Sequence, residues 1–185
     1  DGPLDMRFDN TKGIPLSDWI NDASEKEIME ILYKFGDEKH AKIIAKAIDF
    51  ERKKYPITKT SQLSKIIEHI YPERKKKIHP ATKTFQAFRI FINNELEEFE
   101  SSLVAAQKVL KKNGIIVTIA FHSLEDSVIK NFFNPSLKSF PKDIPLNNIE
   151  YKNFECIAKK IRPSTDEINK NSRSRSAIMR VFQKI

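Results

Sequence analysis

One short run of residues most constrains how this chain can fold: the apolar stretch from Ile115 to Phe121. Its length and its β-branched side chains predict a β-strand, and such a run is typical of a strand that is buried on both faces of a parallel sheet. The following segment, residues 123–133, has a helical pattern. The sequence therefore predicts a strand, a turn and a helix from an α/β fold.

The turn after this strand is polar and reads FHSLED, residues 121–126. In open α/β sheets, ligands bind outside the carboxyl ends of the strands, which makes His122 and Ser123 candidate site residues. The same letters fit a helix start with Ser123 as N-cap and Asp126 at the third helical position. For Asp126 we favour capping, whereas His122 can be either a hydrogen-bonded scaffold residue or a catalytic group.

An all-helical module precedes this α/β part. Helical periodicity runs through residues 17–71, where Ser17 can cap a first helix. Ser24 and Glu27 have the spacing of a capping box for a second helix, which Gly36 is placed to end. Two further helices are expected at about 38–53 and 60–70. These four helices predict a compact module.

The rest of the chain alternates between the two kinds of pattern. Residues 82–110 form either two helices or one helix bent near Asn93-Asn94, and Asn113-Gly114 ends the helical pattern. Residues 151–161 and 177–183 alternate enough to be strands. A polar connection, residues 162–176, joins them.

The charge of the chain favours a polyanionic partner. Lys and Arg number 33 against 25 Asp and Glu, which gives a net charge of +8. Lys75, Lys76 and Lys77 lie in a proline-bracketed segment that is either a solvated linker or a stripe of phosphate contacts. Arg173 and Arg175 alternate in a hydroxyl-rich loop that either presents guanidinium groups to phosphates or is an ordinary hairpin connection.

Several other classes of site are disfavoured. The single cysteine, Cys156, indicates a reducing compartment, and the four histidines lack metal-ligand spacing, so no metal is expected. No run reaches the ~18 apolar residues of a membrane span, and we expect a cytoplasmic protein with no membrane partner. No glycine-rich nucleotide-binding motif is present.

Four blocks of sequence carry a family resemblance. They are GPLDMR (2–7), HPATKTFQAFRI (79–90) followed by NEL (94–96), FHSLED (121–126) and NSRSRS (171–176). In order and spacing they resemble the signature stretches of the bacterial 16S ribosomal RNA cytosine-N4 methyltransferases. The resemblance extends over essentially all 185 residues.

The resemblance implies a class I, Rossmann-like methyltransferase domain into which an all-α substrate-recognition domain is inserted. Residues 1–16 and 78–185 would belong to the methyltransferase domain and residues 17–77 to the insert. In the family the glycine-rich cofactor loop lies upstream of GPLDMR. We therefore expect an incomplete sheet, cofactor-binding residues upstream of residue 1, and weak or no cofactor binding by this polypeptide alone.

The resemblance also implies an activity: S-adenosyl-L-methionine-dependent methylation of N4 of a decoding-centre cytidine in 16S rRNA. Asp5, His122 and Ser123 are then the candidate catalytic residues. The candidate phosphate contacts are Arg7, Lys75, Lys76, Lys77, Arg173 and Arg175. Two alternatives stay open: a non-catalytic, basic RNA-binding module, or a structural half that works only together with an N-terminal fragment.

Overall fold

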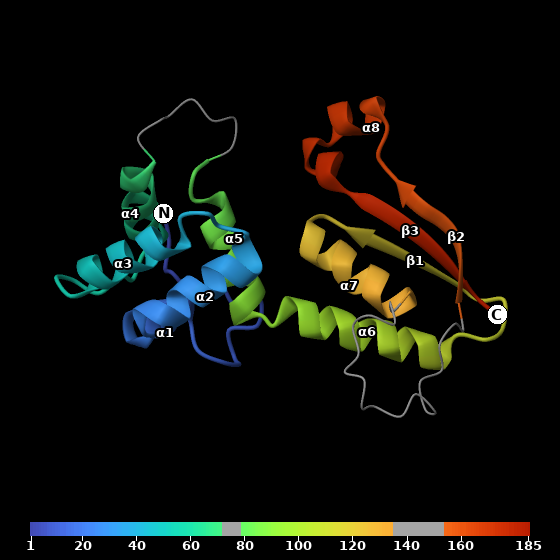
Figure 1. Ribbon diagram of the computed structural model, residues 1–185, viewed down its shortest axis with the longest axis horizontal. Helices are drawn as coiled ribbons and strands as arrows, with labels where there is room; N and C mark the ends of the chain where they lie inside the picture. Colours follow the sequence, from blue (N-terminus) through green and yellow to red (C-terminus); the bar gives the residue numbers. More distant parts are fainter. Residues whose placement is uncertain (72–78, 135–153) are drawn as a thin grey trace. The chain divides into compact units, whose positions relative to one another are not determined.

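A computed structural model describes residues 1–71, 79–134 and 154–185, and within them the chain forms two compact units, residues 1–95 and 96–185. The first unit is helical. Its elements are α1 (Leu16–Asp22), α2 (Glu25–Gly36), α3 (Ala41–Arg52), α4 (Thr60–Ile70) and α5 (Thr82–Ile92) (Figure 1). The first four helices confirm the helical module that the periodicity predicts.

The apolar faces of these helices meet in one core. Its fully buried members come from every helix and from the N-terminal segment, and they include Leu4, Ile20, Ile28, Ile44, Ile67 and Phe88. At Gly36 α2 lies close against α5, because a Cβ there would lie 3.0 Å from the Lys83 carbonyl oxygen and 3.2 Å from the Ala87 Cβ. The helical unit therefore includes α5.

The N-terminal segment is hydrogen-bonded into the same unit. The Leu4 N–H donates to the Thr58 carbonyl at 2.8 Å, and the Leu4 carbonyl accepts from the Ser17 N–H at 2.7 Å. The Gly2 carbonyl accepts from the Thr60 N–H at 3.0 Å. The observed division at residues 95 and 96 thus differs from the predicted segments 1–16, 17–77 and 78–185.

The helix ends agree with the sequence in part. The Ser24–Glu27 capping box is confirmed, with the Ser24 Oγ accepting from the Glu27 N–H and the Glu27 carboxylate accepting from the Ser24 N–H. α2 ends at Gly36, as the sequence predicts, and its C-cap is Asp37, which takes the left-handed conformation at φ 45°. Ser17 does not cap α1, whose N-cap is Pro15.

The second unit combines helices with a sheet. Its elements are α6 (Glu95–Val109), β1 (Ile115–Ala120), α7 (Ser123–Phe133), β2 (Phe154–Ile161), α8 (Thr165–Lys170), a 3₁₀ turn (Ser172–Ser176) and β3 (Ile178–Lys184). A break at Asn93-Asn94 separates α5 from α6, so residues 82–110 form two helices and not one bent helix. The predicted positions of the three strands are confirmed. The sequence did not predict α8.

The three strands form an antiparallel sheet in the order β1-β3-β2, and β3 is central. The register pairs Ile116 with Phe182 and Ala120 with Ile178. Among the described strands β1 therefore lies at an edge, so the prediction that it is buried on both faces of a parallel sheet is wrong for this part of the chain.

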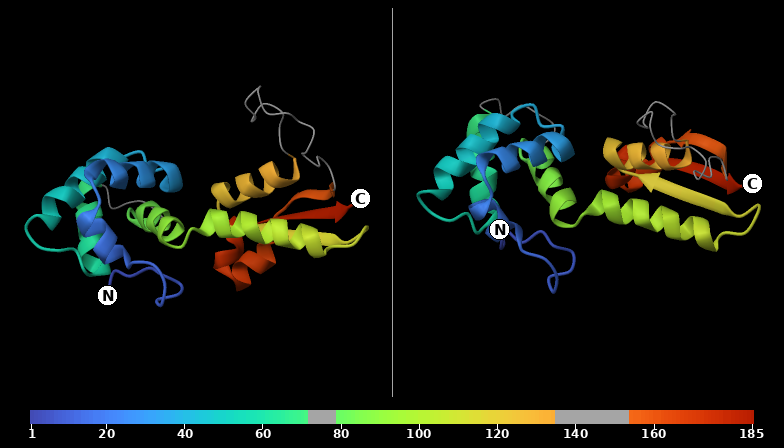
Figure 2. Two further views of the ribbon diagram at one scale, coloured as in Figure 1. Left: turned by 90° about the horizontal axis from the view of Figure 1, so that it is seen from below. Right: turned by 60° about the horizontal axis from the view of Figure 1, so that its bottom comes forward.

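The burial of β1 follows from which face the helices cover. Ile116 and Ala120 pack in a core with Leu103 of α6 and Ile129 of α7, which places both helices on one face. In both views of Figure 2, α6 runs lengthwise beside the sheet. The side chains on the other face are about half exposed: Ile115 (55%), Val117 (55%) and Ile119 (52%).

None of the helices in the described ranges is both long enough and apolar enough to cross a bilayer.

Candidate functional site

The β1–α7 turn holds two of the predicted site residues, and His122 is its cap. The Nδ1 atom of His122 accepts the Glu125 N–H at 3.3 Å. In return, the Glu125 carboxylate accepts the N–H groups of Phe121, at 2.7 Å, and His122, at 3.3 Å. The predicted N-cap, Ser123, is instead the first helical residue, so the predicted capping pair is wrong by one position.

This cap favours one tautomer of the neutral histidine ring. Because Nδ1 of His122 accepts a hydrogen bond, the neutral ring carries its proton on Nε2. Nε2 lies 3.3 Å from Glu125 Oε1, and the His122 side chain is only 13% exposed. Ser123, by contrast, is exposed, and among the described residues its hydroxyl makes no hydrogen bond. The turn therefore presents a held imidazole beside an available hydroxyl.

Asp126 anchors α7 to the sheet and does not cap it. Its carboxylate pairs with Arg180 of β3 through Nε at 2.7 Å and Nη2 at 3.1 Å, and it lies 3.3 Å from Lys130 Nζ. The Arg180 hydrogen bond, with Lys130 adding to it, holds the pKa of Asp126 below its ordinary value despite burial. Arg180 also donates to the Lys159 carbonyl of β2. This ion pair fixes the orientation of α7.

The strand register brings two candidate segments to the same end of the sheet. Ala120 at the end of β1 pairs with Ile178 at the start of β3. His122 follows Ala120 by two residues, and the Arg173–Arg175 turn comes just before β3, so both turns lie at this end. Figure 1 shows α8 at this end of the sheet as well.

The turn that carries the two arginines is ordered from within. Asn171 caps it, since its Oδ1 accepts the Arg173 N–H at 3.1 Å, and the buried Ser174 donates its hydroxyl to the Asn171 carbonyl at 2.8 Å. Arg173 and Arg175, on either side of this buried serine in the sequence, are exposed. Neither forms an ion pair with a described residue, so both guanidinium groups are available to an anion.

Asp5 and Arg7 form a closed pair in the first unit. Arg7 donates to both Asp5 oxygens, from Nε at 2.7 Å and from Nη2 at 2.9 Å, and its Nη1 donates to the carbonyls of Lys12 and Gly13. The Arg7 hydrogen bond lowers the pKa of Asp5, which stays ionised. The guanidinium group of Arg7 is thus used within its own loop.

The sequence reading missed Asn93, which holds this loop. Its Oδ1 accepts the Phe8 N–H at 2.8 Å, and its Nδ2 donates to the Met6 carbonyl at 2.9 Å. Met6 has a positive φ of 65°, a conformation that such fixed hydrogen bonds stabilise. The signal that could have found Asn93 is its place beside the NEL block.

Two further predictions concern the lysine run and the cofactor. Lys75, Lys76 and Lys77 lie outside the described residues. A cofactor cradle would need unused backbone N–H groups at a strand end, but Glu125 already accepts those of Phe121 and His122. The β1–α7 turn therefore does not fit as an anion cradle for a cofactor.

The fold defines a class first: a mixed α/β protein in which a five-helix unit is joined to an antiparallel sheet with helices on one face. The match to known sequences is more specific. The model of the MraW methylase family matches residues 1–185, and the chain belongs to this family.

Individual relatives agree. The chain is 44% identical, over all of its length, to a protein of Alteromonas mediterranea named "Ribosomal RNA small subunit methyltransferase H", and covers 61% of that protein. A protein of the same name from Buchnera aphidicola subsp. Cinara cedri is 46% identical over 98% of the chain, again with 61% of the relative covered. One from Marinomonas sp. is 43% identical and 60% covered. The chain thus spans about three fifths of the length of these relatives.

Proposed function

We propose that this chain serves in the S-adenosyl-L-methionine-dependent methylation of N4 of a decoding-centre cytidine in 16S rRNA. The observation that carries the proposal is the family match over residues 1–185, together with 44% identity to a protein named as a methyltransferase of small-subunit ribosomal RNA. The net charge of +8 supports a polyanionic substrate. The cytoplasm, where ribosomes are assembled, is the proposed location.

The chemistry requires an acceptor near the target amine. The lone pair of the exocyclic N4 is delocalised into the ring, so a nearby acceptor and close positioning both assist its attack on a methyl group. Arg7 occupies both oxygens of Asp5, and His122 uses Nδ1 for its cap. Of the three predicted catalytic residues, Ser123 has the most available side chain, and it is the acceptor in this proposal.

Contacts to the RNA backbone would come from the exposed arginines. Arg173 and Arg175 lie at the same end of the sheet as Ser123 and form no ion pair with a described residue. Arg7 is a weaker candidate because its loop uses its donors. Lys75, Lys76 and Lys77 stay proposed phosphate contacts.

The methyl donor enters the proposal through the family alone. S-adenosyl-L-methionine supplies the methyl group when it is bound, and in the β1–α7 turn the N–H groups of Phe121 and His122 are already used by Glu125. No step of the reaction is therefore assigned to a residue that contacts the donor.

The experiment that tests the function compares 16S rRNA from cells with an intact and with a disrupted gene. Mass spectrometry of nuclease digests should find one N4-methylated cytidine whose methyl group is lost on disruption and restored by the gene. Unchanged methylation, or loss of a methyl group from another base, would overturn the proposal.

A matched pair of variants tests the role of Ser123. Ser123→Ala should lower methylation in the complemented cells by roughly two- to tenfold, the scale of one lost hydrogen bond. Ser127→Ala, which removes a hydroxyl that donates to the Ser123 carbonyl within the same helix, should leave methylation unchanged. Equal methylation by the two variants would rule out Ser123 as the acceptor.

The second candidate function is a non-catalytic RNA-binding module, which the two unpaired arginines favour. It predicts that the chain binds 16S rRNA while disruption of the gene leaves every cytidine methylation intact. The same mass-spectrometric comparison separates the two functions.

A further inference from the structure

A hollow on the helical unit, remote in sequence from the blocks that resemble the family, has the composition of a binding groove. It lies where α2 meets the start of α3 and has a volume of about 630 Å³. Its lining consists of Met29, Glu30, Tyr33, Lys34, Lys39, Ala41 and Lys42. Apolar groups therefore form part of the lining, and three of its seven residues are cationic.

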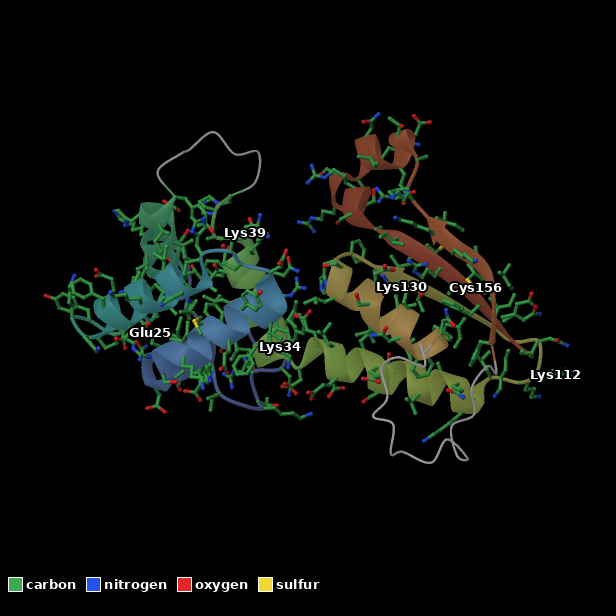
Figure 3. All side chains as sticks on the ribbon, viewed as in Figure 1. Glu25, Lys34, Lys39, Lys112, Lys130 and Cys156 are labelled. Carbon is green, nitrogen blue, oxygen red and sulfur yellow. The ribbon has the colours of Figure 1, made fainter. Side chains whose placement is uncertain are left out.

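The charge of this groove is not neutralised from within the described chain. Glu30 lies 3.8 Å from the Nζ of Lys26, a residue outside the lining. Lys34, Lys39 and Lys42 are exposed, and none of them forms an ion pair with a residue that the structure describes. Figure 3 labels Lys34 on α2 and Lys39 on the turn that follows. The groove thus presents net positive charge to its ligand.

An aromatic ring lies among these cations. Tyr33 is 74% exposed, beside the half-buried Met29 and the buried Ala41. A large exposed ring contributes little to the core of the unit, but its face can stack on a planar ligand. An aromatic side chain flanked by lysines is the combination that binds unpaired nucleotides, with the base on the ring and the phosphates on the cations.

A buried carboxylate holds the turn that carries Lys39. Glu38 is 3% exposed, and its Oε1 accepts the His40 N–H at 3.0 Å and the Tyr71 hydroxyl at 2.5 Å. The preceding residue, Asp37, has the left-handed conformation that reverses the chain between α2 and α3. The groove is therefore preformed, and a ligand does not have to order the turn.

We propose that this α2–α3 groove binds an unpaired strand of RNA, with a base stacked on Tyr33 and phosphates on Lys39 and Lys42. The inference rests on the proposed function for the identity of the polyanion and adds the surface that holds it. A duplex fits this arrangement poorly, because its bases are stacked on one another and cannot reach the tyrosine ring.

The first experiment measures binding of a fluorescein-labelled single-stranded RNA to the whole chain by anisotropy. Tyr33→Ala should weaken binding by roughly five- to 100-fold, the range for loss of one base–aromatic stack. The double variant Lys39→Gln with Lys42→Gln should make the negative slope of log K against log salt concentration shallower by about 1.4. Each phosphate contact on a single strand contributes about 0.7 to this slope.

The chain offers a matched control. Tyr55 is 77% exposed and directly follows two lysines, but Lys53 lies 2.6 Å from Asp49 and Lys54 lies 2.8 Å from Glu51. Tyr55→Ala, and Lys53→Gln with Lys54→Gln, should therefore leave the affinity unchanged within twofold and the salt slope unaltered. Circular dichroism spectra of all four variants should match that of the wild-type chain, because every substituted side chain is exposed.

The outcomes are separable from those of the methylation test. Equal affinities of Tyr33→Ala and Tyr55→Ala, equal binding of single-stranded and duplex RNA, or displacement of the RNA by polyglutamate at equal charge would each overturn the groove. If these tests succeed while gene disruption leaves cytidine methylation intact, the groove stands and the proposed reaction fails. If methylation is lost and the RNA tests fail, the reaction stands alone.

Discussion

At the scale of single residues, the Asp126–Arg180 pair is the most deeply buried ion pair among the described residues. Only 10% of the Asp126 side chain and 12% of the Arg180 side chain are exposed, so removing either partner leaves a desolvated charge behind. Asp126→Asn should lower the free energy of unfolding by about 3 kcal/mol. The double variant Asp126→Asn with Arg180→Met should cost less than the sum of the two single substitutions, and additive losses in urea denaturation would contradict the coupling.

The same pair predicts a dependence of stability on pH. The folded state lowers the pKa of Asp126, so its stabilisation is fully present above the ordinary range of an unfolded aspartic acid, about pH 4. The stabilisation is lost as the pH falls through the lower pKa of the folded state. The wild-type unfolding free energy should therefore decline more steeply than that of Asp126→Asn between about pH 4 and pH 2.

The β1–α7 turn shows which structural details the sequence pattern could predict and which it could not. The sequence placed polar residues at the end of a strand correctly, because the apolar run ends there. It assigned the cap to Ser123, since serine is a common N-cap and histidine is not. The Glu125 carboxylate reaches back to the N–H groups of Phe121 and His122, and its spacing from His122 is that of a capping box. The sequence rule for this box looks for serine or threonine at the N-cap, so it did not select His122.

At the scale of elements, substitutions of His122 can distinguish its structural role at the start of α7 from a chemical role in methylation. His122→Ala removes the cap acceptor and should destabilise the second unit by about 1 kcal/mol, whereas His122→Asn keeps an N-cap side chain and should cost only a few tenths. Thermal denaturation followed by circular dichroism measures both. If His122→Asn folds normally yet restores no methylation, the imidazole contributes more than its cap.

The exposed face of β1 predicts self-association. Val117 and Ile119 are 55% and 52% exposed on an edge strand of the described sheet, and such a surface favours pairing between copies. Val117→Lys should reduce the concentration dependence of static light scattering without lowering the melting temperature. Thr118→Lys, which alters the buried face of the same strand, should instead destabilise the unit.

The predicted element boundaries agree best with the structure where an amphipathic pattern extends over many residues and the capping residues are close together in the sequence. The α2 capping box and the two C-terminal strands were predictable for this reason. The burial of β1 was not predictable, because a strand covered by helices on one face can have the same apolar sequence as a strand covered on both faces. The order of the strands depends on pairing between residues far apart in the chain, such as Ile119 with Met179.

At the scale of the whole molecule, the two hydrophobic cores share no residue. Among the described residues, the buried members of the first core lie between residues 4 and 88 and those of the second between residues 103 and 182. Calorimetry should therefore resolve two transitions. Ile44→Ala should lower one of them, at a cost of about 2–5 kcal/mol, and leave the other in place. A single transition that shifts as a whole would contradict two independent units.

The resemblance identified the family, but the domain boundaries that it implies differ from the boundary between the two compact units. Leu4, Ala87 and Phe88 pack into the helical core although the family pattern assigns their segments to the other domain. Where a segment packs depends on its three-dimensional neighbours, and the spacing of signature blocks does not encode them. For the same reason, no single block in the sequence revealed the α2–α3 groove.

The central position of β3 has a consequence for how this polypeptide is made. Both other described strands hydrogen-bond to β3, which lies at residues 178–184, so neither can join this sheet until those residues have left the ribosome. The helical unit ends at residue 95 and can be complete by then. Of the three described strands, β1 is made first, and its apolar side chains therefore stay unprotected for the longest time before β3 can pair with it.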